Sequence, residues 1–345
     1  MEYTFDELAK IKYGKNQKLV ESPDGTIPIY GTGGLMGYAT KALYDKPSVL
    51  IGRKGTIDKV KFIDTPFWTV DTLFYTEINE AIVLPKFLFY KMSLINFMNY
   101  NEGTTIPSLR TETLNRLVFD IPPLPTQQKI AAILSSLDDK IELNNKINTN
   151  LEQQAQALFK NWFVDFEPFG GKMPEGWKVG KLSDIAEITS GKRPPIKQSD
   201  YSKDVSIPLV GAASVMGYTN QVLYNEPILI TGRVGTHGVI QRFSTECWPS
   251  DNTLVVKSQY YEYVYQIMCN IDYDNMNRGS TQPLITQSDL GKVECIIPDE
   301  GNLNKFEQLT NNLFAKVQEN QLENQKLANI RDTLLPKLMN GEIEV

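Results

Sequence analysis

The sequence of 345 residues has very few of the side chains on which most metal sites and many hydrolytic sites depend. It contains a single histidine, His237, and three cysteines that lie far apart and form no Cys-x-x-Cys pair. An odd number of scattered cysteines argues against a disulfide framework and a zinc site, and it is typical of a cytoplasmic protein. A Ser-His-Asp site would depend on His237 alone. The sequence therefore favours a protein without catalytic groups of its own.

Long apolar runs and an excess of basic charge are also absent. No stretch of 18 or more apolar residues occurs, and the first residues, MEYTFDELAK, lack a basic region followed by an apolar core. The sequence thus predicts neither a membrane span nor a secretion signal. A net charge of −6 does not indicate a nucleic-acid-binding protein, but residues 1–120 hold 14 basic and 14 acidic side chains. The acidic excess is thinly spread, which is compatible with a local basic face.

An internal repeat decides the predicted architecture. The segment IPIYGTGGLMGY at 27–38 returns as IPLVGAASVMGY at 207–218, an offset of 180 residues. The pattern Gly-Arg-x-Gly-Thr at 52–56 returns at the same offset, whereas GTTIPSL at 103–109 matches GSTQPLI at an offset of 176. Matches in one order over most of each half predict two copies of one structural unit.

Each copy begins with a β-rich part. Short apolar runs punctuated by Gly, Pro, Asn and Asp predict mainly strands, with helical patches at 80–99 and 260–271. We place these two domains at residues 1–122 and 178–299. The predicted fold class is α+β, with two mainly-β domains related by the repeat.

Each copy ends with a long helix. Residues 127–163 contain no Gly or Pro and repeat apolar residues at a period of 3.5–3.6, and residues 304–340 show similar spacing, including Leu309. Thr126 is the predicted N-cap of the first helix and Gly341 the predicted stop of the second. At 1.5 Å per residue each helix would span roughly 55 Å. The helical regions are assigned to 123–164 and 300–345, with a Gly- and Pro-rich linker at 165–177.

One apolar stripe along each helix requires a partner. We expect the two helices to pair as an antiparallel coiled coil that holds the β-rich domains apart; alternatively, each helix folds onto its own domain. Asparagines interrupt both stripes, and such residues fix register at a cost in stability. The predicted seam residues are Leu134, Leu137, Ile141, Asn144, Asn148, Leu151 and Leu158 in the first helix and Leu313, Val317, Asn320, Asn324, Leu327 and Leu334 in the second.

Three stretches resemble one protein family over essentially the whole chain. IPPLPTQQKIAAIL leads into the first helix, NWFVDFEPFGGKMPEGWKVGKLSDIAEITSGK spans the linker, and IRDTLLPKLMNGEI closes the second helix. Together with the order domain–helix–domain–helix, they closely resemble the specificity (S) subunits of type I restriction–modification systems.

The resemblance implies a division of labour among subunits. In that family the two variable domains are target-recognition domains, each of which reads one half of a split double-stranded DNA site. The helices form the spacer and dock two methyltransferase (M) subunits, which bind S-adenosylmethionine and carry the catalysis. Restriction (R) subunits, which use ATP and magnesium, join that core. The chain itself is then expected to be a non-catalytic, cytoplasmic subunit without a cofactor.

The paired Gly-Arg-x-Gly-Thr loops are the leading candidates for DNA contact. A Walker loop needs a different spacing and a following helix, whereas IDKVKFID at 57–64 alternates like a strand. Arg53 and Arg233 can fork onto guanine or bind a phosphate, and the glycines permit close backbone approach. The simpler alternative is a hairpin turn with a solvated arginine.

Further loops at matching positions extend the prediction. NEGTTIPSLR and NRGSTQPLIT are polar loops that could equally be ordinary turns, and lysines near the start of each domain could contact phosphate. Trp68 and Trp248 are interpreted as core anchors, and the outer helix residues Gln153, Gln156 and Lys160 as weaker candidates for docking the methyltransferase. The predicted DNA-contacting residues are Lys15, Gly52, Arg53, Lys54, Thr56, Thr104, Thr105, Lys192, Arg193, Arg233, Thr236, His237, Arg278, Ser280, Thr281 and Gln282.

Two other functions stay open on the sequence alone. The chain could belong to a methylation-only system, which nothing in it discriminates from a restricting one. It could also be a coiled-coil scaffold whose β domains bind protein or glycan, for which the acidic charge is the best support.

Overall fold

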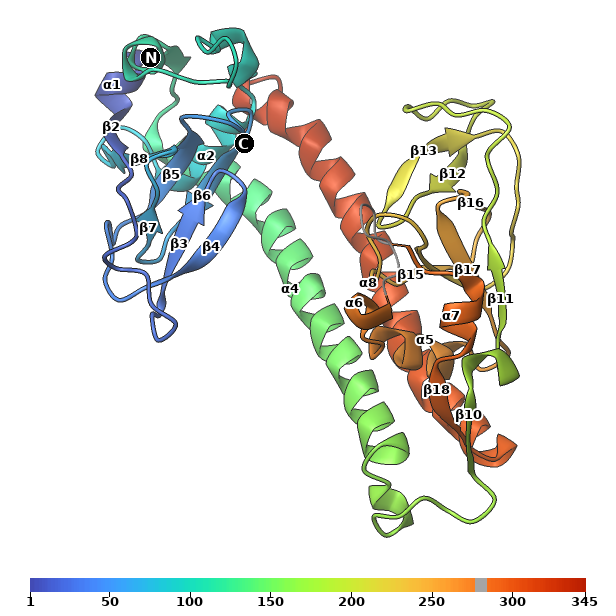
Figure 1. The fold of residues 1–345 in the computed structure, drawn as a ribbon. Helices are drawn as coiled ribbons and strands as arrows, with labels where there is room; N and C mark the ends of the chain where they lie inside the picture. Colours follow the sequence, from blue (N-terminus) through green and yellow to red (C-terminus); the bar gives the residue numbers. More distant parts are fainter. Residues whose placement is uncertain (277–283) are drawn as a thin grey trace. The chain divides into compact units, whose positions relative to one another are not determined.

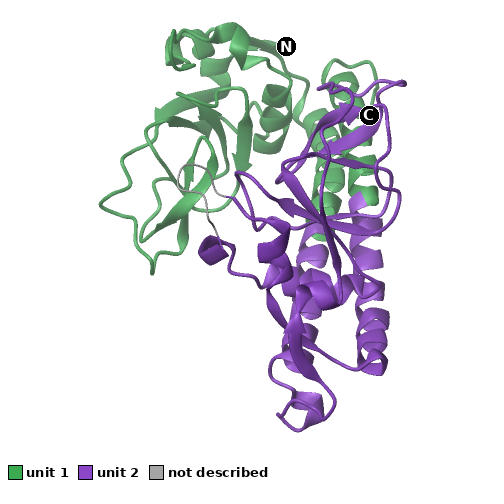
Figure 2. Ribbon diagram, turned by 45° about the vertical axis from the view of Figure 1, so that its right-hand side comes forward, with its two compact units in different colours: residues 1–144, 322–345 green, residues 145–321 purple. Residues whose placement is uncertain are grey.

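A computed structural model describes residues 1–276 and 284–345. The chain forms two compact units (Figure 2). Unit 1 comprises residues 1–144 and 322–345, and unit 2 comprises residues 145–321. Each unit contains one β-rich domain and about half of each long helix (Figure 1). The boundaries of the compact units therefore fall within the two helices rather than at the ends of the β-rich domains.

The β-rich domain of unit 1 is built on two sheets and a two-stranded ladder. The four-stranded sheet has the order β2 (Ala9–Tyr13), β8 (Leu73–Ile78), β5 (Ser48–Gly52), β6 (Val60–Ile63). The three-stranded sheet has the order β4 (Gly34–Ala39), β3 (Ile27–Gly31), β7 (Trp68–Thr69). The ladder joins β1 (Glu2–Thr4) to β9 (Val118–Asp120). Strand β5 lies between β8 and β6 in the larger sheet, and all five of its residues, SVLIG, are buried.

Short helices and the ends of the long helices complete this unit. They are α1 (Phe5–Leu8), α2 (Pro85–Ser93), the 3-10 helix η1 (Phe97–Tyr100) and α3 (Thr111–Asn115). Pro85 is tolerated in the first turn of α2 because that turn needs no amide donor. Phe87 and Leu88 of α2 share one apolar core with Leu134 and Leu338 of the long helices. The long helices therefore belong to the core of this unit.

Unit 2 repeats this design. Its four-stranded sheet has the order β11 (Glu187–Ser190), β17 (Thr253–Lys257), β14 (Ile228–Gly232), β15 (Gln241–Phe243). Its three-stranded sheet has the order β13 (Val215–Thr219), β12 (Ile207–Val210), β16 (Trp248–Pro249), and its ladder joins β10 (Lys178–Lys181) to β18 (Glu294–Ile297). The helices are η3 (Leu182–Asp184), α5 (Tyr261–Cys269), α6 (Tyr273–Met276) and α7 (Gln287–Gly291). Strand for strand, this order confirms the internal repeat.

The two long helices, α4 (Leu124–Phe163) and α8 (Glu300–Met339), pack against each other and run antiparallel. In unit 1, Arg331 Nη1 lies 2.7 Å from Asp138 Oδ1, so the C-terminal half of α8 lies beside the first half of α4. In unit 2, Phe314 and Val317 of α8 pack on Ala155 of α4, so the opposite halves meet there. The predicted antiparallel pairing is confirmed.

Asparagines occupy the middle of the helix pair. In unit 1, Asn144 Nδ2 donates to Asn324 Oδ1 at 2.9 Å, and in unit 2 Asn320 Nδ2 donates to Asn148 Oδ1 at 2.8 Å. All thirteen residues predicted for the seam are buried or half-buried. Leu309, however, is 47% exposed, because the buried face of α8 runs at this end through Phe306, Thr310 and Phe314.

The predicted helix starts are wrong by a few residues. Helix α4 begins at Leu124, so Thr126 lies inside its first turn and is not the N-cap; Pro125 fits there because a first turn leaves its amides unpaired. Helix α8 begins at Glu300, where Asp299 Oδ1 accepts the Asn302 amide at 3.0 Å. The predicted stop is confirmed, since Gly341 has φ +73 and the Glu342 amide returns to Lys337 O at 2.9 Å.

The predicted linker is partly structured. Residues Glu167–Phe169 form the 3-10 helix η2, and Trp177 is buried in the core of unit 2. Its indole Nε1 donates to Asp299 Oδ2 at 2.8 Å, next to the start of α8. The end of the linker is thus fastened to the cap of the second long helix.

Candidate nucleic-acid interface

Two cationic loops of unit 1 leave the four-stranded sheet at the same end of its strands, where β8 begins. We call this end of the domain its loop edge, or simply its edge. Strands β2 and β5 flank β8, and the register pairs Tyr13 with Phe74 and Gly52 with Leu73. The last residues of β2 and β5 therefore lie on either side of the start of β8. The loops that follow them carry Lys15 in one case and the Gly-Arg-Lys-Gly-Thr motif in the other.

The Gly-Arg-Lys-Gly-Thr loop is a tight turn with a fixed backbone. A methyl group on Gly52 would lie 2.1 Å from Thr56 O, and Gly55 has φ +90, so both positions require glycine. The Arg53 amide donates to Thr72 O at 2.8 Å, and Arg53 O accepts the Leu109 amide at 2.9 Å. The loop leads into strand β6, which confirms that it is not a Walker loop.

The Arg53 side chain is held in place at this edge. Its Nη1 donates to Asp71 O at 2.9 Å, and its guanidinium carbon lies 5.1 Å from the centroid of the Tyr13 ring. Tyr13 itself is 51% exposed. The sequence prediction missed Tyr13, although an aromatic residue that ends a strand just before Gly14-Lys15 was the available signal. The pair presents a planar cation stacked on an exposed ring.

Trp68 anchors the lysine loop. Its indole Nε1 donates to Lys15 O at 2.9 Å, and the Lys15 amide donates to Thr69 O at 2.8 Å. A methyl group on Gly14 would lie 2.0 Å from Val70 O. Trp68 is buried, as predicted for a core anchor, and it also fixes the backbone of the loop that displays Lys15.

A third loop joins the other two. The Gly55 amide donates to Pro107 O at 2.9 Å, which ties the 52–56 loop to residues 101–108. Asn101 Oδ1 organises that loop by accepting the amides of Gly103 and Ser108 at 2.8 and 2.9 Å. Thr104 and Thr105 are exposed on it. Three loops that were identified separately in the sequence therefore meet at one edge of the domain.

Unit 2 fixes the backbone of the equivalent edge with the same bonds. The Arg233 amide donates to Asn252 O at 2.8 Å, and Arg233 O accepts the Ile285 amide at 2.9 Å. Gly235 has φ +81, and Trp248 Nε1 donates to Lys192 O at 2.8 Å. Arg278, Ser280, Thr281 and Gln282, which were also predicted to contact DNA, lie outside the described residues.

His237 differs from the other candidates in its surroundings. Its Nδ1 lies 3.0 Å from Gly235 O and its Nε2 lies 3.8 Å from Asp274 Oδ1, while only 9% of the side chain is exposed. The ring also packs near Tyr273. His237 is thus mostly enclosed by its own domain.

Most of the other candidates are accessible. The exposed ones are Lys15, Lys54, Thr56, Thr104, Thr105, Lys192, Arg193 and Thr236. Arg53 and Arg233 are half-buried, and Gly52 is buried. Cations, hydroxyls and tight glycine turns on one edge are suited to phosphate and base-edge contacts. Among residues 1–276 and 284–345 there is no cluster of three or more potential metal ligands.

Comparison with known proteins identifies the family. The model of the type I restriction modification DNA specificity domain matches residues 1–153 and 174–331, and so covers both β-rich domains and most of both helices. The chain belongs to this family. It is a non-catalytic specificity subunit whose role is DNA target recognition. This membership removes the alternative of a scaffold whose domains bind protein or glycan.

Two relatives agree with this assignment, and one solved structure shows the same fold. The chain is 29% identical over 343 residues to the type I restriction enzyme MjaIX specificity subunit of Methanocaldococcus jannaschii, covering 88% of this chain and 79% of that one. It is 28% identical over 384 residues to the HindI specificity subunit of Haemophilus influenzae, covering 82% and 83%. A crystal structure of a type I S subunit from M. genitalium has the same fold, with a TM-score of 0.66, 19% identity and 98% of this specificity subunit covered.

Gln153, Gln156 and Lys160, the predicted docking residues for the methyltransferase, are all exposed on α4. Within the described part of the chain, no helix is long and apolar enough to cross a membrane.

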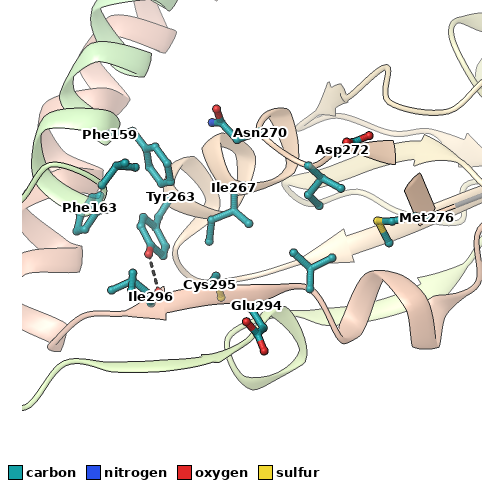
Figure 3. A pocket seen from close by; sticks show the side chains of 13 residues that line it. Phe159, Phe163, Tyr263, Ile267, Asn270, Asp272, Met276, Glu294, Cys295 and Ile296 are labelled. Carbon is teal, nitrogen blue, oxygen red and sulfur yellow. Dashed lines mark hydrogen bonds between the residues drawn. The ribbon is translucent and has the colours of Figure 1, made fainter. Parts of the chain in front are cut away.

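A cavity of about 430 Å³ lies in unit 2 (Figure 3). Phe159 and Phe163 of α4, Tyr263 and Ile267 of α5 and Cys295 of β18 line it, and Tyr263 OH donates to Ile296 O at 2.6 Å. At the equivalent position in unit 1, by the offset of 176, the larger and buried Phe119 stands in place of Cys295.

Proposed function

We propose that this specificity subunit recognises a bipartite double-stranded DNA target, with one half-site for each β-rich domain. The observation that carries the proposal is the equivalence of the two loop edges. In both domains the Gly-Arg-x-Gly-Thr loop and the tryptophan-anchored lysine loop leave the four-stranded sheet together. Because the loops differ in sequence between the domains, the two half-sites differ.

The DNA contacts divide by chemistry. Exposed lysines such as Lys15, Lys54 and Lys192 bind phosphates and set the position of the domain on the duplex. Arg53 and Arg233 present guanidinium groups to base edges, where the fork matches guanine O6 and N7. Thr104, Thr105 and Thr236 supply hydroxyl groups beside them.

The helix pair sets the gap between the half-sites. A 40-residue helix at 1.5 Å per residue is roughly 60 Å long, which exceeds one DNA turn of about 34–36 Å. The bases between the half-sites are not read. Two copies of one structural unit on an antiparallel helix pair suit binding of two identical methyltransferase subunits, in part through Gln153, Gln156 and Lys160.

Catalysis and cofactors belong to the partner subunits of a cytoplasmic complex. The methyltransferase subunits bind S-adenosylmethionine, and the restriction subunits, where the system has them, use ATP and magnesium. This chain supplies target choice and the scaffold on which those subunits assemble.

The proposal is tested by co-expressing the chain with its methyltransferase and mapping modified bases across the host genome. We expect one motif made of two short specific sequences separated by a fixed unread gap. Methylation of an undivided palindrome would contradict the proposal. Binding of the complex to the motif should weaken steeply with salt, and binding that is independent of salt would contradict the loop assignment.

A further inference from the structure

Each β-rich domain exposes two consecutive apolar side chains on a hairpin. In unit 1 they are Leu35 and Met36 at the start of β4, which are 53% and 56% exposed. In unit 2 they are Val215 and Met216 at the start of β13, which are 45% and 40% exposed. The pairs occupy equivalent positions of the repeat, at the offset of 180.

A β-bulge turns these side chains outward in both domains. In unit 1, Ile29 pairs with Gly37 and Tyr30 pairs with Leu35, so Met36 is an extra residue on β4. The hairpin of unit 2 shows a register shift at the equivalent step. A regular strand would direct successive side chains to opposite faces, whereas a bulge re-aims one of them. The paired exposure is thus built into the hairpin twice.

The hairpins lie against the cationic loops of their own domains. A methyl group on Gly55 would lie 3.7 Å from the Thr32 hydroxyl, and one on Gly232 would lie 2.9 Å from the Ala212 Cβ. Thr32 and Ala212 belong to the hairpin turns just before the apolar pairs. Each apolar pair therefore continues the edge that carries the Gly-Arg-x-Gly-Thr loop.

We propose that these apolar pairs contact C5-methyl groups of thymines in the major groove, Leu35 and Met36 at one half-site and Val215 and Met216 at the other. The inference rests on the proposed bipartite recognition. The thymine methyl is the apolar group of the major-groove edge and is the natural partner of an apolar side chain placed among cations. Leu35 and Val215 differ in shape, so the pairs suit differently placed methyl groups.

A groove contact fits these hairpins better than a protein contact. In each domain the turn before the apolar pair faces the Gly-Arg-x-Gly-Thr loop, and in unit 1 that loop carries the exposed Lys54 and the stacked Arg53. Cationic loops beside an apolar pair match the major groove, where phosphates flank the thymine methyl. Met36 Sδ also lies against Gly31, since a methyl group there would approach it to 2.4 Å. The hairpin therefore presents a compact apolar surface next to groups that bind phosphate.

The test uses the complex of the full chain with its methyltransferase and the mapped target duplex. Deoxyuridine replaces thymidine throughout one half-site at a time, which removes only the methyl groups. Binding is measured for the natural chain, for the double variants Leu35→Ala/Met36→Ala and Val215→Ala/Met216→Ala, and for the controls Val118→Ala and Val179→Ala. Both control residues are 60% exposed but lie on the β1–β9 and β10–β18 ladders.

We expect the effect of removing thymine methyl groups to depend on the apolar pair that contacts them. Loss of each contacted methyl weakens binding by the natural chain about fourfold. The Leu35→Ala/Met36→Ala variant should lose its sensitivity to deoxyuridine at one half-site and keep it at the other. The Val215→Ala/Met216→Ala variant should show the reverse. The two control variants should stay sensitive at both half-sites. Where a double variant binds too weakly to measure, Met36→Ala and Met216→Ala serve in its place.

Several results would overturn the inference. They are a mapped half-site without any A·T pair, full sensitivity to deoxyuridine in both variants, and failure of a variant to co-purify with the methyltransferase, which would make the hairpin a protein-docking surface. Failure of bipartite recognition itself would be seen earlier, as the absence of a split motif in the mapping.

Discussion

Arg53 and Lys54 are adjacent in sequence but are placed for different tasks. The Arg53 guanidinium is fixed by Asp71 O and by the Tyr13 ring, so its direction is set before DNA arrives. Among the residues that the structure describes, no hydrogen bond or ion pair engages Lys54 Nζ, which is exposed. A fixed fork suits a base edge, and a free ammonium group suits a phosphate.

This difference predicts separate effects of two substitutions. Lys54→Gln should weaken binding to all sequences and lower the slope of log K against log salt by about one. Arg53→Gln should instead change the preferred base in one half-site. Salt titrations with the target and with an unrelated duplex measure both effects, and Lys172→Gln in the linker is the control. An unchanged slope for Lys54→Gln would argue against the phosphate contact.

Glu307 provides a pH-dependent contribution to stability in unit 2. Its carboxylate accepts the amides of Glu262 and Tyr263 at 3.1 and 2.8 Å, and Glu262 in turn bonds Arg242 at 2.6 Å. Burial raises the pKa of Glu307 to about 7 from 4.5. An unfolded glutamate releases its proton near pH 4.5, whereas the folded one keeps it to about pH 7. Its contribution is therefore complete below pH 4.5 and is lost as pH rises through 7.

Comparison of the natural chain with Glu307→Gln tests this effect. The substitution keeps the size of the side chain and removes the titration. Between pH 5 and pH 8 the natural chain should lose on the order of 1–3 kcal/mol of unfolding free energy relative to the variant. Urea unfolding followed by circular dichroism measures the difference. Parallel pH profiles for the two proteins would show that the carboxyl group titrates normally.

At the scale of elements, the asparagine pairs specify how α4 and α8 align. Asn144 bonds Asn324 and Asn148 bonds Asn320, so each helix contributes two asparagines to the middle of the seam. The two asparagines of each helix are four residues apart, so a shift of one helical turn would keep only one asparagine pair and leave the other two amides without an asparagine partner. Unpaired buried amides are costly, so the correct register is favoured.

Substitution in this polar layer should therefore be non-additive. Asn320→Leu alone should destabilise the chain by about 1–3 kcal/mol, because it leaves the Asn148 amide unpaired. Asn148→Leu with Asn320→Leu should recover most of that loss, since two apolar residues then face each other. Thermal unfolding of the full chain measures both, with the exposed Gln153→Ala as control. Additive losses would contradict the pairing as the source of the effect.

The helices also show what the sequence could and could not predict. Each helix was predictable because apolar residues recur at a period of 3.5–3.6 over more than 30 residues of local sequence. The pairing followed because each helix has one apolar stripe that needs a partner. Their starts did not follow, because Pro125 and Gly301 look like helix breakers but are harmless in a first turn. Leu309 was misplaced because the buried position beside it is Thr310, whose hydroxyl is satisfied by Phe306 O at 2.8 Å.

At the scale of the whole molecule, the repeat made most of the candidate site predictable. A loop found twice at one offset identified equivalent positions, and Trp68 and Trp248 were correctly assigned to the core. The convergence of the loops was not predictable, because it depends on the β2-β8-β5 order and on bonds such as Gly55 N to Pro107 O. Tyr13 and the bulged Met36 were missed for the same reason, since strand register decides their exposure.

The division between domains and helices predicts the outcome of changing the spacer. Insertion of seven residues into α4 and a matching seven into α8 should lengthen the unread gap by about three base pairs, since seven residues add about 10 Å. Both half-sites should stay the same, because no loop is altered. Mapping modified bases after co-expression with the methyltransferase gives the result. A changed half-site with an unchanged gap would contradict this assignment.

The loops at the candidate interface are shaped almost wholly by main-chain atoms. Arg53 and Lys15 are fixed through their own amides and carbonyls, and the glycines and tryptophans that enforce the turns are separate residues. A mutation at Lys15, Lys54 or Thr56 therefore leaves the turn intact while replacing a side chain that we propose contacts DNA. Such a surface can change its target by single steps without passing through unfolded intermediates, which gives this chain an open route to new sequence preferences over evolutionary time.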